Sequence, residues 1–341
     1  MRVSRQTLIW TCLAALLAMA LAMPIAGWAA PDSGAAEEGG RGEGFQPECK
    51  EAKGPDKKEE KDECPSTFGP IITDTAVPIE KGKFAIQPTF GLSFTTNNFT
   101  QSWRRVSAGG DFQSFNMSWK FTYGLINNLE VYAVIPYIHN WVGDVDAPGP
   151  NNERFASFGG LGDISLTFKY RLVEETETLP TVSAYFTPTF PSGRFRHLNP
   201  VFLGTDLIGN GSYVFTPGLN FSKWVKPFVF YGNLWYSMQT AQDSSDNGRQ
   251  FPRDFVTVNL AAEYPITSKW VACLEMVSFY DGGRLFGHQS NVMPGALISL
   301  APEIEYMATD KFALSLGLNV ALAGKNNSGS LTPLFSMVYS F

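Results

Sequence analysis

The sequence predicts an all-β fold, an antiparallel up-and-down barrel of about twelve strands that crosses a lipid bilayer. Apolar and polar residues alternate with a period of two from Lys83 onward, as in strands that present one face to lipid. The connections between these strands alternate in length. The last residues, 334–341, alternate aromatic or apolar with small side chains. A strand of this kind would expose a bare aromatic edge in water, whereas a barrel closed in lipid pairs every backbone group.

Residues 1–29 have the pattern of a secretory signal peptide. Arg2 and Arg5 precede an apolar run, and Gly27-Trp28-Ala29 offers a small-x-small cleavage pattern, so we place the cut after Ala29. The alternative is a retained transmembrane helix, which the prolines and glycine that follow directly do not favour. Loss of both arginines leaves 24 basic against 32 acidic residues, a net charge of about −8. This balance argues against a nucleic-acid partner.

Residues 30–75 form the expected leader, a charged segment almost free of large apolar side chains that cannot bury a core. We expect a flexible periplasmic leader in which Cys49 and Cys64 form a disulfide, because the compartment is oxidising. A metal site or haem attachment is the alternative, but Cys-x-x-Cys-His is absent and no His lies nearby. A plug inside the barrel is a further option. Cys273 is expected to be a small packing residue within a strand.

The barrel is expected over residues 76–341, in segments about ten residues long, as a tilted membrane strand requires. In one of them Ile164, Leu166 and Phe168 alternate with Ser165, Thr167 and Lys169. The third and ninth segments alternate less clearly. The expected spans are 83–95, 112–123, 129–140, 162–172, 181–190, 211–221, 226–239, 255–264, 270–279, 295–307, 311–322 and 332–341.

Short connections are expected after every even-numbered strand, and long ones rich in Gly, Asn, Asp and Pro after every odd-numbered strand, including the eleventh. Short turns of outer-membrane barrels face the periplasm and long loops face outward. We therefore expect both termini in the periplasm. A soluble sandwich or lipocalin-like barrel is the alternative, with the apolar face inside. The other face, made mostly of Ser, Thr, Asn, Gly and Ala with few charges, suits a lumen better than an exterior.

The polar face supplies the candidate site. A basic wall could face an acidic wall across a wet channel and orient polar solutes, or the same residues could form salt bridges that fill a narrow barrel. Three inward aromatic residues could stack on an aromatic solute or only pack. The candidate lumen-lining residues are Lys120, Asp163, Lys169, Arg171, Tyr185, Tyr231, Trp235, Glu263, Glu275, Glu303 and Glu305.

The sequence offers little for catalysis or cofactors. His288-Gln289-Ser290 has the His-x-Ser spacing of outer-membrane phospholipase A, but Pro302 stands where that family has the Asn that orients the His. The glycine-rich stretch 159–163 is followed by no helix, which argues against a phosphate loop. We expect no enzyme activity, no cofactor and no metal.

Two features carry a family resemblance. The terminal Phe341 with Tyr339 resembles the C-terminal signal of bacterial outer-membrane barrels, which implies recognition by the outer-membrane assembly machinery. Residues 160–171, together with Gly69-Pro70-Ile71-Ile72 and Ile135-Pro136-Tyr137, resemble the outer-membrane "transporter" family labelled putative MetA pathway of phenol degradation. The resemblance covers roughly residues 69–341.

The resemblance implies an outer-membrane barrel linked to uptake of phenol-like or other hydrophobic compounds. We therefore expect a passive channel for uptake or efflux of small solutes, surrounded by outer-membrane lipids. The alternative is a scaffold barrel that holds a periplasmic or extracellular partner through its leader or its long loops; a lipid hydrolase is a third option.

Overall fold

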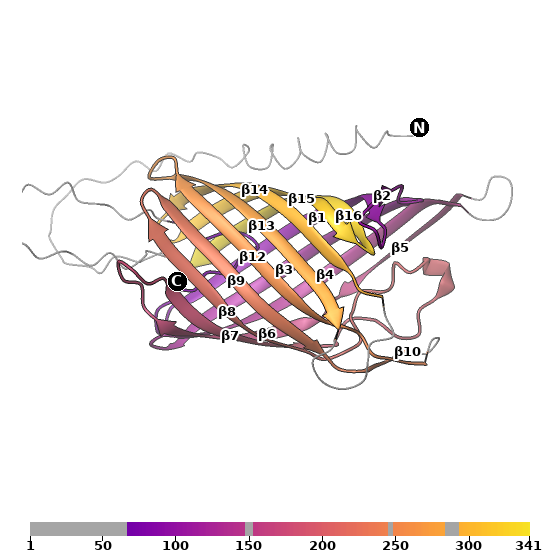
Figure 1. Ribbon diagram of the computed structural model, residues 1–341, viewed down its shortest axis with the longest axis horizontal. Helices are drawn as coiled ribbons and strands as arrows, with labels where there is room; N and C mark the ends of the chain where they lie inside the picture. Colours follow the sequence, from indigo (N-terminus) through magenta and orange to yellow (C-terminus); the bar gives the residue numbers. More distant parts are fainter. Residues whose placement is uncertain (1–66, 147–152, 245–247, 284–292) are drawn as a thin grey trace, which may run out of the picture. The chain divides into compact units, whose positions relative to one another are not determined.

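The computed structural model describes residues 67–146, 153–244, 248–283 and 293–341, and in them twelve long strands form one closed antiparallel barrel (Figure 1). Each barrel strand pairs with its neighbours along the chain, so the predicted all-β barrel of about twelve strands is confirmed. The barrel strands are β1 (Phe84–Phe99), β3 (Asp111–Ile126), β4 (Leu129–Asp146), β6 (Ile164–Val173), β7 (Thr181–Phe190), β8 (Val214–Val225), β9 (Phe228–Gln239), β12 (Asp254–Pro265), β13 (Trp270–Gly283), β14 (Ala296–Thr309), β15 (Phe312–Lys325) and β16 (Asn327–Ser340).

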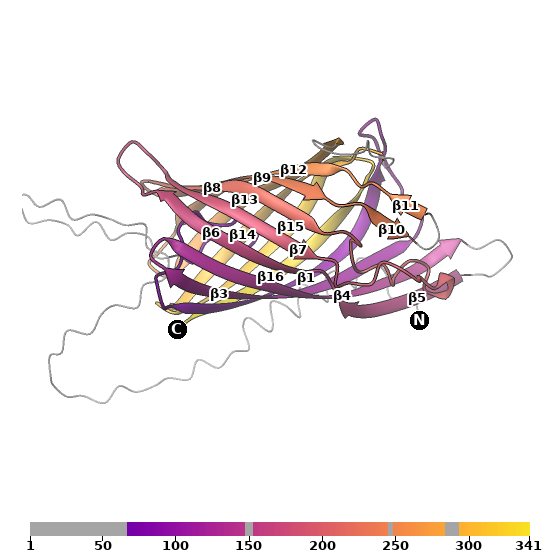
Figure 2. The ribbon, with the colours of Figure 1, turned by 90° about the horizontal axis from the view of Figure 1, so that it is seen from below.

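Shorter elements lie in the connections. The strands β2 (Arg105–Val106) and β5 (Glu153–Leu161) extend the barrel sheet, and β10 (Gln242–Ser244) and β11 (Gly248–Gln250) form a separate two-stranded sheet, seen at the right-hand end of the barrel in Figure 2. A single turn of 3-10 helix, η1 (Pro200–Phe202), lies between β7 and β8. Among the described residues, no helix has the length and apolar character needed to cross a membrane.

The barrel closes between its first and last strands. β16 runs antiparallel to β1, with Phe335 opposite Phe90, and the Phe341 backbone N–H donates to the Phe84 carbonyl at 2.7 Å. The rings of Phe84 and Phe341 lie 5.7 Å apart at this junction. Closure removes the open strand edge that the terminal aromatic strand would otherwise present.

Every predicted strand span overlaps one barrel strand, and β7 has the expected bounds, 181–190. The two segments with weaker alternation form β4 and β13. The weak alternation in β4 is caused by Tyr132, which is buried and faces the lumen. Its hydroxyl lies 3.5 Å from the Asp74 carboxylate. An inward aromatic residue on a polar face blurs the period of two.

The connections follow the predicted alternation except after the eleventh strand. Only Asn326, with a positive φ of 45°, separates β15 from β16 there, so the expected long loop is wrong. The reason is that β16 begins earlier than expected and its first residues continue the ladder with β1, where Ser328 lies opposite Asn98. A left-handed residue suits such a tight strand reversal, and Asn tolerates this conformation well.

The barrel wall has an apolar outer face and a polar inner face, as a membrane barrel requires. On β6, Phe168 and Leu172 point outward and are exposed, whereas Lys169 on the opposite face is 1% exposed. On β13, Leu274 is 52% exposed and Glu275 is fully buried. A soluble sandwich would bury the leucines and expose the charges, so this alternative is wrong.

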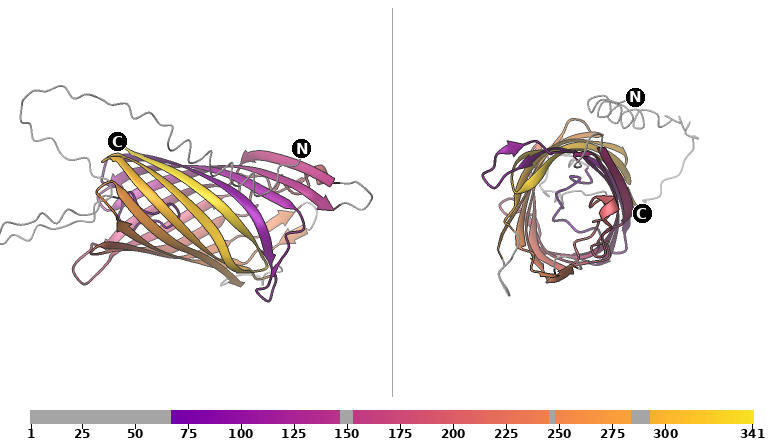
Figure 3. Two further views of the ribbon diagram at one scale, coloured as in Figure 1. Left: turned by 90° about the horizontal axis from the view of Figure 1, so that it is seen from above. Right: turned by 90° about the vertical axis from the view of Figure 1, so that its right-hand side faces the viewer.

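The chain before β1 lies within the barrel rather than outside it. In the view along the barrel in Figure 3, the indigo segment that precedes β1 runs inside the ring of strands. Hydrogen bonds join it to side chains on eight different strands, from β14 to β3. We call residues 67–82 the lumenal segment.

Gly124 on β3 makes the route of this segment possible. A Cβ at Gly124 would lie 1.9 Å from the Glu80 carbonyl oxygen, so only glycine allows the segment to pass this point before it turns into β1. Backbone hydrogen bonds hold the turn, with Gly82 N–H donating to Gly124 O at 2.8 Å and Gly124 N–H donating to Lys83 O at 3.0 Å.

Candidate functional site: the lumenal segment and its anchors

The first half of the lumenal segment is bound through its backbone by glutamates of the wall. Glu305 accepts from the Thr67 hydroxyl at 2.8 Å and from the Phe68 N–H at 3.1 Å. Further along, Glu275 accepts from the N–H groups of Ile72 and Thr73, at 2.9 and 2.5 Å. The segment has no sheet partner of its own, so these carboxylates satisfy backbone donors that would otherwise be buried without a partner.

Short polar side chains hold the middle of the segment. The Asn233 amide pairs with Asp74 in both directions, accepting from its N–H at 3.0 Å and donating to its carbonyl at 2.8 Å. The Ser222 hydroxyl accepts from the Ala76 N–H at 2.8 Å, and the Ser183 hydroxyl donates to the Ala76 carbonyl. These contacts fix the segment against β7, β8 and β9.

The Asp74 carboxylate is the centre of the polar network. Lys120 donates to one oxygen at 3.2 Å, and the other accepts from Lys169 at 3.4 Å and from Asn220 at 2.9 Å. Lys169 also pairs with Glu130 at 2.8 Å and donates to the Thr75 carbonyl at 2.8 Å. A single side chain of the segment thus joins β3, β6 and β8, and Glu130 adds β4.

Residues 67–75, which the sequence assigns to a flexible leader, lie inside the barrel, as in the plug alternative. They are bound in the lumen, so the part of the chain that belongs with the barrel begins before residue 76. The signal peptide, Cys49 and Cys64 lie outside the described residues.

The lumenal segment lies between the basic and the acidic residues that the sequence places in the lumen. Glu275, Glu303 and Glu305 bind backbone N–H groups of the segment, with Glu303 accepting from Ile71 at 3.2 Å. Lys120 and Lys169 bind Asp74. Neither a wet channel between facing walls nor direct salt bridges between them includes the chain that lies between these residues.

Two further candidates lie away from Asp74. Arg171 donates twice to the Asn128 side-chain oxygen, at 3.0 and 2.6 Å, at the turn between β3 and β4. The Asp163 carboxylate accepts from the N–H groups of Gly193 and Asn210, at 2.8 and 2.6 Å. Asp163 therefore holds both ends of the connection between β7 and β8 in place, and it lies apart from the charged residues around Asp74.

The predicted inward aromatic residues form two arrangements. Tyr185 and Trp235 stack with ring centroids 4.8 Å apart and an interplanar angle of 10°. Gly218 lies opposite both on the strand between them, and a Cβ there would approach the Trp235 ring to 2.4 Å, so glycine makes the stack possible. Tyr231 is buried and donates to Glu263 at 2.7 Å, packed with Val229, Ala261 and Cys273.

The stack is connected to the network around Asp74. The Trp235 indole N–H donates to the Asn220 side-chain oxygen at 2.7 Å, and the amide of the same Asn220 donates to Asp74. Tyr132 adds an aromatic face, with the Lys120 ammonium 4.1 Å from its ring centroid. Tyr132 and Trp235 therefore both adjoin the polar network around Asp74.

Sequence reasoning missed several of these residues. Glu130 occupies a polar-face position of its strand, and the alternation could have shown it. Asp74, Ser183, Ser222, Asn220 and Asn233 are short polar residues of a kind common in lumens, and only their contacts distinguish them. In the described part of the chain, no three His, Cys, Asp or Glu side chains are placed to hold a metal ion.

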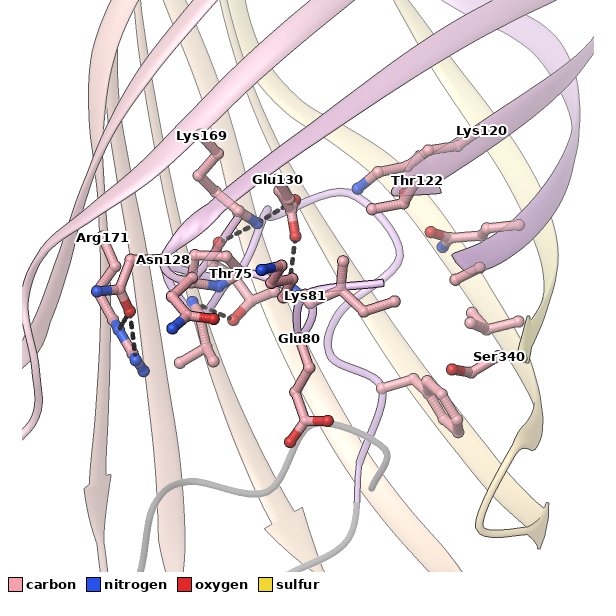
Figure 4. A pocket seen from close by; sticks show the side chains of 18 residues that line it. Thr75, Glu80, Lys81, Lys120, Thr122, Asn128, Glu130, Lys169, Arg171 and Ser340 are labelled. Atoms are coloured by element: carbon pink, nitrogen blue, oxygen red, sulfur yellow. Dashed lines mark hydrogen bonds and ion pairs between the residues drawn. The ribbon is translucent and has the colours of Figure 1, made fainter. Parts of the chain in front are cut away.

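A cavity of about 590 Å³ lies between the lumenal segment and the wall, near the turn that Arg171 binds (Figure 4). Its lining comes from Phe68, Thr75 and residues 77–81 of the segment, from the turn between β3 and β4, and from β1, β3, β4, β6 and β16. In Figure 4, Lys120, Glu130 and Lys169 lie together at one side of this space. The lumen is thus narrowed by the segment, with space left beside it.

Comparison with known families decides the classification. Residues 105–332, more than half of the 341-residue chain, match the family described as "Putative MetA-pathway of phenol degradation". The chain belongs to this family. The predicted resemblance is therefore confirmed, although the lumenal segment and β1 precede the matched residues. No curated protein matches the sequence.

The chain is similar to solved structures of outer-membrane barrels, and one of them shares its fold. An outer membrane channel from Pseudomonas putida F1 superposes with a TM-score of 0.62 at 17% identity, covering 78% of this chain and 98% of the channel. The translocator domain of the autotransporter NalP from Neisseria meningitidis gives 0.46 at 13% identity, covering 77% and 90%. The toluene transporter TbuX from Ralstonia pickettii gives 0.39 at 9% identity, covering 77% and 90%. The first likeness shows the fold, and the other two add no argument.

A closed barrel with an apolar outside is the architecture of integral proteins of the bacterial outer membrane. The fold of this family member, with its exposed leucines and phenylalanines and its buried lumenal charges, therefore places it in that membrane.

The network around Asp74 predicts a pH dependence. Burial acts to raise the pKa of Asp74, but the attraction of Lys120 and Lys169 and their hydrogen bonds outweigh it, so the pKa lies below its ordinary value of 3.8. A carboxyl whose pKa is lowered stabilises the bound arrangement above its ordinary pKa, and this stabilisation is lost as the pH falls through the lower value. We expect the lumenal segment to loosen in acid and the conductance in a planar bilayer to be higher at a pH well below 3.8 than at about pH 7.

Asp74→Asn is the control for this titration, because it removes the titrating group and leaves the other carboxyl groups in place. Its conductance should change less between the same two pH values. An equal change in the wild type and the variant would assign the effect to groups other than Asp74.

Proposed function

We propose that this protein is a passive outer-membrane channel for small solutes, with phenol-like and other hydrophobic compounds as its candidate substrates. The family description, which refers to phenol degradation, and the shared fold with an outer membrane channel of Pseudomonas putida F1 support this proposal. Solutes would move down their gradient, in either direction, through the space that the lumenal segment leaves.

The observation that carries the proposal is the aromatic stack beside the polar centre. Tyr185 and Trp235 are only partly buried and offer ring surface in the lumen, next to the hydrogen-bonded network of Asn220 and Asp74. A phenol carries one apolar ring and one hydroxyl group. Aromatic side chains can stack on its ring, and the neighbouring polar groups can exchange hydrogen bonds with its hydroxyl group.

We expect the wild-type barrel to conduct in a planar bilayer and phenol to reduce this conductance. Trp235→Ala should raise the phenol concentration for half-maximal block by about three- to tenfold, because an aromatic pair contributes about 0.5–1.5 kcal/mol. Gly218→Val should act in the same direction by pushing the two rings apart. Trp119→Ala is the matched control, since Trp119 lies on the exposed outer face.

If the folded wild-type barrel conducts and phenol does not reduce its conductance, the aromatic site is contradicted. A folded barrel that conducts nothing would contradict the channel itself.

The scaffold barrel remains the second candidate, and the lumenal segment is the observation that favours it, because bound chain narrows the lumen. Deletion of residues 30–66 separates the two functions. A channel should conduct as before without these residues, whereas a scaffold should lose its periplasmic partner. The lipid-hydrolase option rests on His288 and Ser290, which lie outside the described residues; His288→Ala would abolish phospholipid hydrolysis if it were correct.

A further inference from the structure

The connection between β7 and β8, residues 191–213, folds back over the lumen. It lies at the end of the barrel that carries the long connections, and this end faces outward in outer-membrane barrels. In the view along the barrel in Figure 3, the helical turn η1 of this connection lies within the ring of strands. We call residues 191–213 the mouth loop.

Contacts with the inner face of β4 and β5 hold the mouth loop over the lumen. Asn140 of β4 lies an even number of residues from the lumenal Tyr132, and Phe158 of β5 lies opposite Asn140, so both side chains face the lumen. The Asn140 amide donates to the Thr205 carbonyl at 3.0 Å. The rings of Phe158 and Phe202 meet edge to face, with their centroids 5.2 Å apart. The loop therefore packs against one side of the lumen wall.

An ion pair helps to make the mouth loop a folded unit. Arg194 pairs with Asp206 at 3.1 Å, and the same Asp206 oxygen accepts from the Asn199 N–H at 2.9 Å. Asp206 is fully buried, and the Arg194 guanidinium also lies 5.1 Å from the centroid of the Phe158 ring. A loop with buried polar contacts of its own and with contacts to the wall is stable against local opening.

Asp163 joins the two ends of the mouth loop to the wall. It lies between β5 and β6, and its two carboxylate oxygens accept from the N–H groups of Gly193 and Asn210, at 2.8 and 2.6 Å. A Cβ at Gly209 would lie 2.5 Å from backbone atoms of Gly193, so glycine allows the two arms of the loop to touch. The base of the loop is therefore closed and is held by a single side chain of the wall.

We propose that the mouth loop is the outer constriction of the channel and that Asp163 is the positioning residue that holds it over the lumen. The loop limits the size of the solutes that enter from outside, and the lumenal segment narrows the path further in. This inference rests on the proposed function, because a constriction acts only on solutes that pass through the lumen. It adds the first selection step on their path.

Thiol reactivity tests whether Asp163 holds the loop. The cysteines of the mature chain, Cys49, Cys64 and Cys273, are first replaced by alanine. Thr205→Cys then places a thiol where the side chain is 5% exposed, so a soluble thiol reagent should modify it slowly. Asp163→Ala should raise this rate at least about tenfold, because it removes two hydrogen bonds to a charged group. Asp163→Asn keeps one acceptor oxygen and should raise the rate less.

Polymer exclusion in a planar bilayer tests whether the loop is the constriction. Polyethylene glycols of increasing mass are added to the extracellular side only, and the largest one that still lowers the conductance reports the size of the outer entrance. Asp163→Ala should shift this limit to heavier polymers and leave the limit measured from the other side unchanged. Asp281→Ala is the matched control, because Asp281 accepts from the Gly295 N–H and holds a different long connection. It should change neither the thiol rate nor the polymer limit. Heat-dependent gel mobility checks that each variant is folded.

The outcomes distinguish this inference from the proposed function. If Thr205→Cys with an intact Asp163 reacts as fast as Val201→Cys, which is 74% exposed at the start, the folded loop is overturned. An unchanged thiol rate or an unchanged outer limit in folded Asp163→Ala overturns the proposal. If phenol does not reduce the conductance but the outer limit shifts, the aromatic site fails and the constriction is supported. A folded barrel that conducts nothing contradicts the channel and the constriction together, whereas the thiol rates still decide whether Asp163 holds the loop.

Discussion

Asp74→Asn should raise the single-channel conductance of the barrel severalfold. The carboxylate of Asp74 accepts from Lys120, Lys169 and Asn220, and it is the one acidic side chain of the lumenal segment that binds the basic wall. Hydrogen bonds to charged groups contribute about 1.5–3 kcal/mol each, and an amide cannot replace the two ion pairs. The middle of the segment should therefore leave its position for part of the time and widen the lumen.

Planar-bilayer recordings at neutral pH measure this effect. Asp310→Asn is the matched control, because Asp310 is an exposed turn residue between β14 and β15. Unchanged conductance in folded Asp74→Asn would mean that the glutamate contacts to Phe68, Ile71, Ile72 and Thr73 hold the segment without help from Asp74.

Lys169→Met should destabilise the barrel by about 3–5 kcal/mol, the usual cost of removing one partner of a buried ion pair. Lys169 is 1% exposed and lies between two carboxylates, Asp74 and Glu130, at 3.4 and 2.8 Å. Methionine fills a similar volume but leaves both anions buried with less compensation. The change therefore isolates the charge of the side chain from its packing.

Urea unfolding of the barrel in lipid vesicles, followed by tryptophan fluorescence, measures the loss. Lys311→Met is the control, with an exposed lysine outside the lumen. The double variant Lys169→Met with Glu130→Gln should recover part of the loss, because it removes one of the stranded charges. A Lys169→Met barrel as stable as the wild type would show that water already solvates this site.

Most of the barrel strands could be predicted, because the alternation of apolar and polar residues that identifies them is a local property of the sequence. Alternation depends only on which side chains face lipid, so Phe168 and Lys169 carry the information for β6 by themselves. The same logic placed Glu263, Glu275 and Tyr231 on the inner face, where they are buried. The error after the eleventh strand arose where Asn326 and its polar neighbours have the composition of a loop but extend the ladder of β1 and β16.

The contacts of the site could not be predicted in this way. Asp74 lies 95 residues from Lys169 and 146 from Asn220 along the chain, and nothing in its neighbourhood signals that it will meet them. Gly218 resembles any strand glycine until the register places it between Tyr185 and Trp235.

The sequence alone determined the class of fold, the number of barrel strands, the inner and outer faces and the family, because each follows from local periodicity or from recognisable motifs. Only the tertiary structure decided that residues 67–82 lie in the lumen and that Asp74 joins the basic wall. The physical reason is that the lumenal segment has no periodicity of its own. Its position is set by buried backbone donors and one carboxylate that find partners only after the barrel has closed around them.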